Sequence, residues 1–199
     1  MSYEQLYTPG YLEVFCGPMK SGKTLELIHR INKLEYRDDV NFVFFKPSID
    51  TRDKTIKSRF ETKIFECVFV KENDFNDLFN NYKGEEVVAI DEAHFFEKEV
   101  LIKFVNYLLK NNKNVLIAGL ELDFRGEPFG AMPEIICMAD KIYKLSGICD
   151  VKGCNNIARM TQRLVNGKPA HYSSPLILIG DAEEGYETRC RKHHAVKRD

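Results

Sequence analysis

The sequence predicts an α/β protein with an open, mostly parallel sheet, followed by a small appendage of strands and loops. Candidate strands and helices alternate through about residue 146, and this alternation is typical of parallel strands joined by right-handed crossover connections. From Gly147 to Asp199 the alternation stops, and turn-rich segments with three of the six cysteines take its place. We therefore expect an α/β domain at residues 1–146 and a smaller unit, the appendage, at residues 147–199.

The strands are expected at short runs that are rich in apolar, aromatic and β-branched residues. The most informative run, EVVAID at residues 86–91, is largely apolar and ends in an acid, as is typical of a central parallel strand covered on both faces. The other expected strands are residues 11–16, 41–46, 63–70, 114–120 and 140–146. Helices are expected from Thr24, where Leu27, Ile28, Ile31 and Leu34 recur at helical spacing, and at residues 72–81 and 98–112. The appendage contains one short apolar run, PLILIG at residues 175–180.

The composition argues against nucleic acid and membranes as partners. The formal net charge is -1, whereas proteins that bind nucleic acid usually present a strongly basic surface. The one concentrated basic segment is RCRKHHAVKR at residues 189–198. No stretch approaches the ~18 apolar residues of a membrane span, and MSYEQLYTPGYLEVF at the N-terminus lacks a basic leader followed by an apolar segment. We expect a cytoplasmic protein.

A phosphate-binding loop is expected between the first strand and the first helix. GPMKSGKT at residues 17–24 matches G-x-x-x-x-G-K-[ST], the motif of P-loop NTPases, and lies between a strand and a helix as that motif requires. Its glycines let backbone N–H groups surround the phosphates, Lys23 can reach the β- and γ-phosphates, and the Thr24 hydroxyl can bind Mg²⁺. The sequence therefore predicts a P-loop NTPase fold of the RecA-like type. The expected nucleotide-binding residues are Gly17, Pro18, Met19, Lys20, Ser21, Gly22, Lys23 and Thr24.

Two adjacent carboxylates follow the central strand. Asp91 stands where the second magnesium ligand of a P-loop protein usually lies, and Glu92 comes directly after it. Such a pair can divide the work, with one carboxylate holding Mg²⁺ while the other accepts a proton from the attacking group. If Glu92 activates water, the protein is an ATPase; if it takes a proton from a substrate hydroxyl, it is a kinase. Ala93 and His94 complete the expected nucleotide-site segment.

The letters DEAH at residues 91–94 also occur in a large group of helicases. A helicase ordinarily has two sheet domains with the nucleotide between them and a basic path for the strand. Here about 145 residues form one α/β domain and the remainder is too short for a second. The four letters alone therefore do not predict a nucleic-acid motor.

A closed metal site is expected in the appendage. CDVKGC supplies Cys149 and Cys154, and CRKH supplies Cys190 and His193. Two such pairs, separated by about 35 residues, are typical of a tetrahedral structural zinc site. His194 is an alternative to His193, and Asp150 is a remote alternative to Cys154. The remaining cysteines, Cys16, Cys67 and Cys137, lie in or beside apolar segments, and core packing is their expected role.

Six features in this order resemble the thymidine kinases of the cytosolic, zinc-containing type, in a bacterial-like form. The features are GPMKSGKT, FKPSIDTR, VAIDEAHFF, GLELDFRGEPFG, MTQRL and the cysteine pairs. The resemblance extends from residue 11 to about residue 194. The phosphate loop is weakly specific because it is widespread, whereas GEPFG followed by a zinc unit that contains TQRL is strongly specific.

The resemblance implies ATP-dependent phosphorylation of thymidine, and of deoxyuridine, at the 5′-hydroxyl, in nucleotide salvage for DNA synthesis. It implies that Glu92 is the general base, that Lys23 holds the transferring phosphates and that Arg52 steadies the γ-phosphate. Asp91 and Thr24 would organise Mg²⁺. It also implies a homo-oligomer, a dimer or a tetramer, and feedback inhibition by thymidine triphosphate.

The resemblance further implies a nucleoside pocket that a lasso from the zinc unit closes. The matching positions are Met19, Phe95, Leu120, Phe124, Phe129, Thr161, Leu178, Gly180 and Tyr186. A flat apolar base fits aromatic and aliphatic walls with a few fixed polar groups. Phe95, Phe124 and Phe129 have the alternative interpretation of ordinary core residues, whereas Thr161 and Tyr186 are expected to be more exposed.

Three positions depart from the family pattern. His94 stands where the family typically has glutamine, the C-x4-C pair is longer than the usual first pair, and SRFETK at residues 58–63 lacks a glycine that is often found there. The competing hypothesis is a regulatory P-loop ATPase whose zinc unit binds DNA or a protein partner. That function would favour an electropositive appendage, yet the appendage also carries the acidic segment GDAEEGYE.

Overall fold

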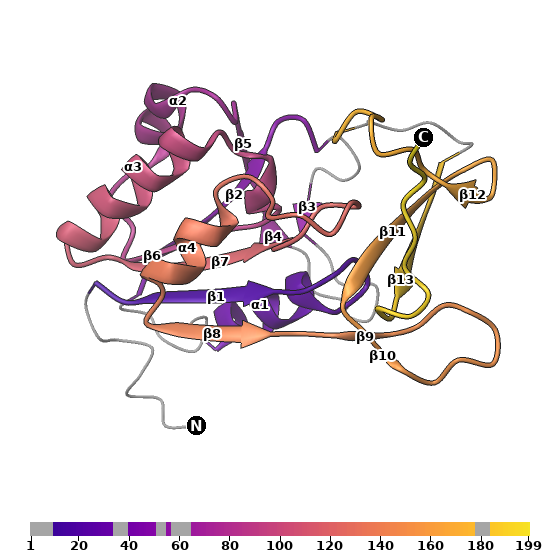
Figure 1. Ribbon diagram of the computed structural model, residues 1–199. Helices are drawn as coiled ribbons and strands as arrows, with labels where there is room; N and C mark the ends of the chain where they lie inside the picture. The colour runs from indigo at the N-terminus through magenta and orange to yellow at the C-terminus, as the bar shows by residue number, and fades with distance from the viewer. Residues whose placement is uncertain (1–9, 34–39, 51–54, 57–64, 178–183) are drawn as a thin grey trace.

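The computed structural model describes residues 10–33, 40–50, 55–56, 65–177 and 184–199. Within these residues a six-stranded sheet has the order β5-β2-β6-β7-β1-β8 (Figure 1). Its strands are β1 (Leu12–Cys16), β2 (Phe42–Pro47), β5 (Val68–Val70), β6 (Val87–Ile90), β7 (Asn114–Gly119) and β8 (Lys141–Lys144). Every neighbouring pair is parallel. The expected α/β class with a mostly parallel sheet is confirmed.

Helices cover both faces of this sheet (Figure 1). One face packs against α1 (Lys23–Asn32), through Leu27, Ile28 and Ile31. The other face packs against α2 (Phe75–Asn81), α3 (Lys98–Lys110) and α4 (Met132–Met138). Because both faces are covered, all residues of β6 and β7 are buried, as the apolar run at residues 86–91 predicts.

A buried ion pair ties α1 to the sheet. Arg30 of α1 pairs with Glu13 of β1, and the two side chains are 8% and 2% exposed. A charge buried this deeply is tolerated only with a partner, since an unpaired one would have to give up its hydration. The pair therefore fixes the helix whose first residues, Lys23 and Thr24, belong to the phosphate loop.

Two expectations for the α/β part need correction. The strand expected at residues 63–70 is divided: β4 (Phe65–Glu66) pairs with β3 (Thr55–Ile56), while β5 joins the main sheet beside β2. The expectation failed because one apolar run supplies strands to two different sheets. Helix α4 was not expected, although the proline at its start is a common helix-start signal.

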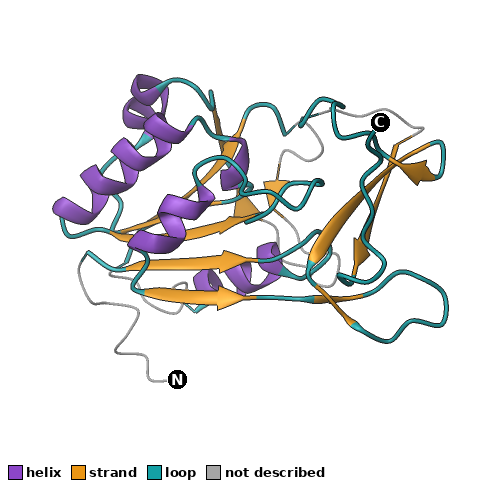
Figure 2. Cartoon of the chain, in the orientation of Figure 1, coloured by secondary structure: helices purple, strands orange, loops and turns teal. Residues whose placement is uncertain are grey.

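The appendage is built from strands and loops and has no helix within the residues described (Figure 2). One ribbon pairs β9 (Gly147–Ile148) with β10 (Ile157–Ala158). A second sheet has the order β12-β11-β13, from β11 (Met160–Val165), β12 (Lys168–Pro169) and β13 (Glu184–Arg189). The short apolar run PLILIG forms no strand at residues 175–177, and its remaining residues lie outside the description.

The three cysteines with an expected core role differ in burial. Cys16 is buried and Cys67 is half-buried, but Cys137 is exposed. The expectation for Cys137 was wrong because α4 is amphipathic and buries Met132 and Ile135 instead. Among the described residues, no helix is both long and apolar enough to cross a membrane.

Candidate active site

The phosphate loop, residues 17–24, leaves β1 at its carboxyl end and runs into α1. Gly22 precedes the helix with φ 87°, a left-handed conformation that glycine adopts without steric cost. Lys23 is 9% exposed, and its ammonium donates to the Pro18 carbonyl at 2.7 Å. Burial lowers the pKa of Lys23, while Glu92, Asp91 and Glu121 act in the opposite direction. A cation is thus held inside a loop that is ready to receive anionic phosphates.

Asp91 directly follows β6 at the carboxyl end of that strand, and its carboxylate faces the Thr24 hydroxyl. The Thr24 hydroxyl lies 3.2 Å from both carboxylate oxygens of Asp91. Burial, with help from the charge of Glu92, raises the pKa of Asp91 to about 7, although Lys46 and Lys23 oppose the rise. No role was expected for Lys46, even though it belongs to the quoted segment FKPSIDTR. Lys46 pairs with Asp50 at 2.8 Å.

Glu92 has an unusual backbone conformation. Its φ is 51°, and it directly precedes a 3₁₀ turn at Ala93–Phe95. Residues other than glycine rarely adopt this left-handed conformation, and such exceptions concentrate at functional sites. The Glu92 side chain is 22% exposed, so its carboxylate can be reached from outside while its neighbour Asp91 is buried.

His94 lies beneath Glu92 and is 3% exposed. Its Nδ1 accepts a hydrogen bond of 3.1 Å from the backbone N–H of Leu120, and its Nε2 lies 3.5 Å from Glu92 Oε2. The ring packs against Phe95 at 4.2 Å and against Phe129 at 4.8 Å between centroids. The histidine that departs from the family's usual glutamine thus contacts a backbone N–H, a carboxylate and two aromatic rings.

The aromatic residues expected around a nucleoside form two groups. Phe95 and Phe129 lie edge to face, with centroids 6.3 Å apart, and both rings pack against the His94 ring. Phe124 is buried, and two guanidinium groups lie near its ring, that of Arg125 at 5.2 Å and that of Arg163 at 5.4 Å from the centroid. Leu120 is buried as well, whereas Phe95 is half-buried.

The two arginines also bind the backbone of the segment at residues 174–175 of the appendage. Arg125 donates to the Ser174 carbonyl at 2.9 Å, and Arg163 donates to the Pro175 carbonyl at 2.5 Å. Arg163 is 1% exposed and is the largest of the fully buried side chains. The loop at residues 121–130 is thereby joined to the appendage, and His194 adds a contact of 2.9 Å to the Phe124 carbonyl.

The phosphate loop and the appendage meet at Met19, and we call these bonds the Met19 contact. The Met19 N–H donates to Thr161 Oγ1 at 3.1 Å, and the Thr188 hydroxyl donates to the Met19 carbonyl at 2.8 Å. Thr161 and Thr188 are direct partners in the β11–β13 pairing. Next to them, Lys20 pairs with Asp150 at 3.0 Å. Thr161 is only 3% exposed, so the expectation that it is exposed was wrong: its hydroxyl lies between the two parts of the chain.

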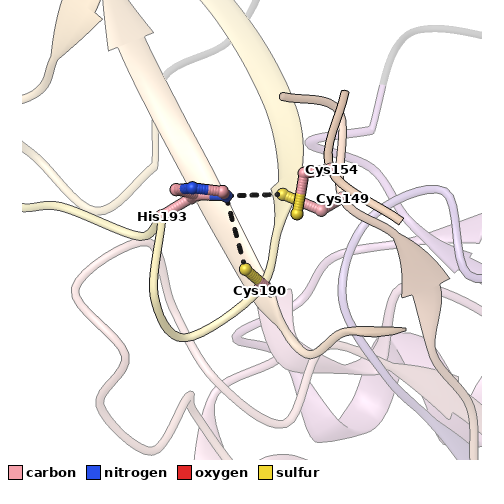
Figure 3. A group of neighbouring side chains, drawn as sticks. All are labelled: Cys149, Cys154, Cys190 and His193. Atoms are coloured by element: carbon pink, nitrogen blue, oxygen red, sulfur yellow. Dashed lines mark hydrogen bonds between the residues drawn. The ribbon is translucent and has the colours of Figure 1, made fainter. Parts of the chain in front are cut away.

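The four expected metal ligands converge (Figure 3). The ligand atoms of Cys149, Cys154, Cys190 and His193 all lie within 4.8 Å of one another. His193 Nδ1 is 3.5 Å from both Cys149 Sγ and Cys190 Sγ. Burial raises the pKa of the Cys190 thiol, but hydrogen bonds from the backbone N–H groups of His193 and Lys192, together with contacts to the Cys149 and Asn156 side chains, lower it to about 7.

The alternatives left open for these ligands have other contacts. His194 bonds to the Phe124 carbonyl, and the Asp150 carboxylate accepts from Lys20 and from the backbone N–H of Thr188. Among the residues the structure describes, the cluster therefore consists of three cysteines and one histidine.

Some expected site residues lie outside the described part of the chain: Arg52, Leu178 and Gly180, together with the loop at residues 58–63. Tyr186 is half-buried on β13, opposite Arg163. The contacts of Arg163, Arg125, Thr188 and Asp150, which join the appendage to the α/β part, were not expected from the sequence. Two signals were available: Arg125 and Arg163 lie in the quoted segments GLELDFRGEPFG and MTQRL, and Asp150 and Thr188 lie within two residues of the expected metal ligands Cys149 and Cys190.

Comparisons with known proteins agree on one family. A family model described as thymidine kinase matches residues 10–194. A protein named thymidine kinase from Coprothermobacter proteolyticus is 45% identical over 188 residues, which cover 94% of this chain and 91% of the relative.

Solved structures give weaker likenesses. A replication initiator DnaA bound to AMPPCP and single-stranded DNA is 14% identical with a TM-score of 0.47, over 72% of this chain and 44% of that one. Domain III of the Thermotoga maritima replication initiation protein DnaA is 17% identical with a TM-score of 0.45, over 71% of this chain and 58% of that one.

The phosphate loop between β1 and α1, together with an acid at the end of β6, defines a P-loop NTPase fold. That class includes enzymes with many acceptors, and the loop alone does not distinguish them. The match over residues 10–194 makes the distinction: the chain belongs to the thymidine kinase family, and it is an enzyme of that family.

The Met19 contact predicts that removing the Thr188 hydroxyl weakens ATP binding. Thr188→Val keeps the shape of the side chain but leaves the Met19 carbonyl without its donor. We expect the Kd for ATP to rise about fivefold, because one such bond is worth about 1 kcal/mol. Titration of ATP into the nucleotide-free variant measures the change, with Ser173→Ala, an exposed hydroxyl in the appendage, as the control. An unchanged Kd in Thr188→Val would show that the contact does not position the loop.

The raised pKa of Asp91 predicts that its charged carboxylate lowers the free energy of unfolding at neutral and alkaline pH. A carboxyl group whose pKa rises on folding penalises the folded state once it is charged. The penalty is absent below about pH 4, grows as pH rises toward 7 and is complete above 7. In the absence of nucleotide and Mg²⁺, Asp91→Asn should therefore raise the free energy of unfolding by up to about 4 kcal/mol at pH 8 and by almost nothing at pH 4.

Urea unfolding at both pH values measures this difference. Asp199→Asn is the control, since it removes the same charge from a side chain that is 97% exposed. Equal stabilisation by Asp91→Asn at pH 4 and pH 8 would contradict the proposed cause.

Proposed function

We propose that this protein transfers the γ-phosphoryl group of ATP to the 5′-hydroxyl of thymidine, and of deoxyuridine, in nucleotide salvage for DNA synthesis. The observation that carries the proposal is the accessible Glu92 carboxylate beside the buried Asp91, at the mouth of a phosphate loop in a chain of the thymidine kinase family. A carboxylate in that position can serve an acceptor hydroxyl, as a kinase requires.

Thr24 and Asp91 are the residues that would hold Mg²⁺. A hydroxyl and a carboxylate are the oxygen ligands that Mg²⁺ prefers, and the two groups already lie 3.2 Å apart. Burial and the charge of Glu92 raise the pKa of Asp91, and a bound cation would favour the charged form of this carboxylate. When bound, the ion would neutralise charge on the β- and γ-phosphates.

The chain's own residues perform the other tasks of phosphoryl transfer. The backbone of residues 17–24 would enclose the phosphates, and Lys23 would exchange the Pro18 carbonyl for the transferring group. Glu92 would accept the proton of the 5′-hydroxyl as this oxygen bonds to the γ-phosphorus and the bond between that phosphorus and the departing ADP breaks, while Arg52 would steady the γ-phosphate. Little covalent chemistry is required of the protein, since positioning and charge neutralisation supply most of the acceleration in this reaction class.

The nucleoside would bind beside Glu92, against aromatic and aliphatic side chains. Phe95 and Phe129 would form one wall through their edge-to-face pair. The remaining pocket residues would be Met19, Leu120, Phe124, Thr161, Leu178, Gly180 and Tyr186. Thr161 would contribute to this pocket by positioning Met19 of the phosphate loop, because the Thr161 hydroxyl already accepts a hydrogen bond from the Met19 N–H.

We further propose that the appendage, residues 147–199, is a zinc-binding domain beside an α/β domain at residues 1–146. In a tetrahedral site, bonds of about 2.3 Å to sulfur and 2.0 Å to nitrogen separate the ligand atoms by about 3.5–3.8 Å. The distances of 3.5 Å from His193 to Cys149 and to Cys190 fit that geometry. All four ligands would come from protein, so the zinc would be structural. Homo-oligomers and inhibition by thymidine triphosphate complete the proposal and rest on the family.

Turnover that requires thymidine is the main test. With Mg-ATP, the protein should release ADP when thymidine or deoxyuridine is added, and Glu92→Gln should lower kcat about 10²- to 10⁴-fold with little change in ATP affinity. Glu97→Gln, an exposed acid nearby, is the control. ADP release that ignores thymidine and responds to DNA would overturn the kinase in favour of a regulatory ATPase.

The zinc site predicts a stoichiometric metal. Purified protein should contain one zinc per chain, and Cys154→Ala and His193→Ala should each lose it and unfold at lower temperature. The matched controls are Cys137→Ala, an exposed cysteine, and His194→Ala, whose ring bonds to the Phe124 carbonyl. Full zinc content in His193→Ala, measured by elemental analysis, would remove that residue from the ligand set.

A further inference from the structure

We propose that His94 is a positioning residue for Glu92: its neutral imidazole is fixed as the Nε2–H tautomer and donates that proton to the Glu92 carboxylate. This inference rests on the proposed role of Glu92 as the base. It assigns a task to His94, for which the steps of phosphoryl transfer described above name none.

The Leu120 contact determines the tautomer. The backbone N–H of Leu120 is a donor, so the ring nitrogen that faces it at 3.1 Å must present a lone pair. That nitrogen is Nδ1, and in a neutral imidazole the proton then resides on Nε2. A protonated ring would set two N–H groups against each other at this distance, and the 3%-exposed site offers little water as a substitute.

The Nε2–H side of the ring faces the base. Nε2 lies 3.5 Å from Glu92 Oε2, at the outer limit of a hydrogen bond. Contacts of this kind are often long before substrate is bound, and they shorten in the reactive complex. The His94 side chain is 1% exposed and that of Glu92 is 22% exposed, so a buried donor directs a carboxylate that extends toward the substrate.

The packing around His94 keeps this donor in place. Phe95 and Phe129 contact the ring from two sides, with centroids 4.2 Å and 4.8 Å away. The backbone is confined too: a Cβ on Gly130, where φ is 53°, would lie 2.6 Å from the His94 carbonyl oxygen. Gly130 is therefore the residue that allows the loop after Phe129 to approach the turn that carries His94.

The same contacts place the base relative to the proposed nucleoside wall. Leu120 supplies the N–H that orients the ring, and Phe129 packs on it. The wall that would hold the thymine and the donor that directs Glu92 are thus one packed unit. A positioning role predicts that its loss lowers kcat, since the geometry of the reacting groups changes while the binding surfaces remain.

The test compares two substitutions of His94. Glutamine has one acceptor and one donor at its end and can satisfy Leu120 and Glu92 together, so His94→Gln should lower kcat by less than about threefold. Leucine has neither group, so His94→Leu should lower kcat about 10- to 100-fold, with KM for thymidine and Kd for ATP within about twofold. His29→Leu, an exposed histidine in α1, is the control.

A double substitution separates this inference from the proposed function. If His94 acts through Glu92, then His94→Leu should change kcat less than about twofold in the Glu92→Gln background. Equal losses from His94→Leu in both backgrounds, or equal losses from His94→Gln and His94→Leu, would overturn the positioning role. Near-normal turnover in Glu92→Gln alone would instead overturn Glu92 as the base. Thermal unfolding of each variant identifies any loss of kcat that comes from unfolded protein.

Discussion

The structure depends most on the backbone of Met19, whose N–H group and carbonyl oxygen are both hydrogen-bonded to threonine hydroxyls of the appendage. Its N–H reaches Thr161 and its carbonyl receives the hydroxyl of Thr188, so the phosphate loop and the β11–β13 pair share one geometry. Thr188 lies two residues before Cys190, and Asp150, which pairs with Lys20, directly follows Cys149. The cluster of cysteines and histidine therefore holds the very segments that contact the phosphate loop. In this arrangement a structural metal would order the nucleotide site without touching the nucleotide.

A second theme is the conflict between charge and burial at the carboxyl ends of the strands. Asp91, Lys23 and Lys46 are all nearly inaccessible to solvent. Burial raises the pKa of Asp91 and lowers that of Lys23, so it favours the neutral form of both groups. A stable α/β sheet would avoid such groups, since desolvating a charge is costly unless a partner compensates it. Their presence together, beside a left-handed Glu92, is the pattern of a site arranged for a charged ligand.

Local patterns in the sequence predicted the sheet class and the position of the phosphate site, because the phosphate loop and the buried strand before Asp91 are continuous segments. The cysteine pairs were predictable for the same reason, since each pair lies on a single turn. Contacts between distant segments were not predictable: Arg163 with Pro175, Thr188 with Met19, and His94 with Leu120 are joined by the fold, and no spacing encodes them. The division of residues 63–70 between two sheets and the exposure of Cys137 have the same origin, because tertiary partners decide which side of a segment is covered. The roles of Arg52, Leu178 and Gly180 remain predictions from the family.

The exposure of Cys137 has a practical consequence. Cys149 and Cys190 are buried and Cys16 is buried in the core, while Cys137 is exposed near the end of α4. Helix α4 begins two residues after Gly130, the glycine that lies against the His94 carbonyl. A thiol-reactive fluorophore on Cys137 would therefore sit outside the proposed pocket, on a helix directly connected to its wall. Such a label would give an optical signal for rearrangements of the wall in solution, without altering any residue that contacts the phosphate loop.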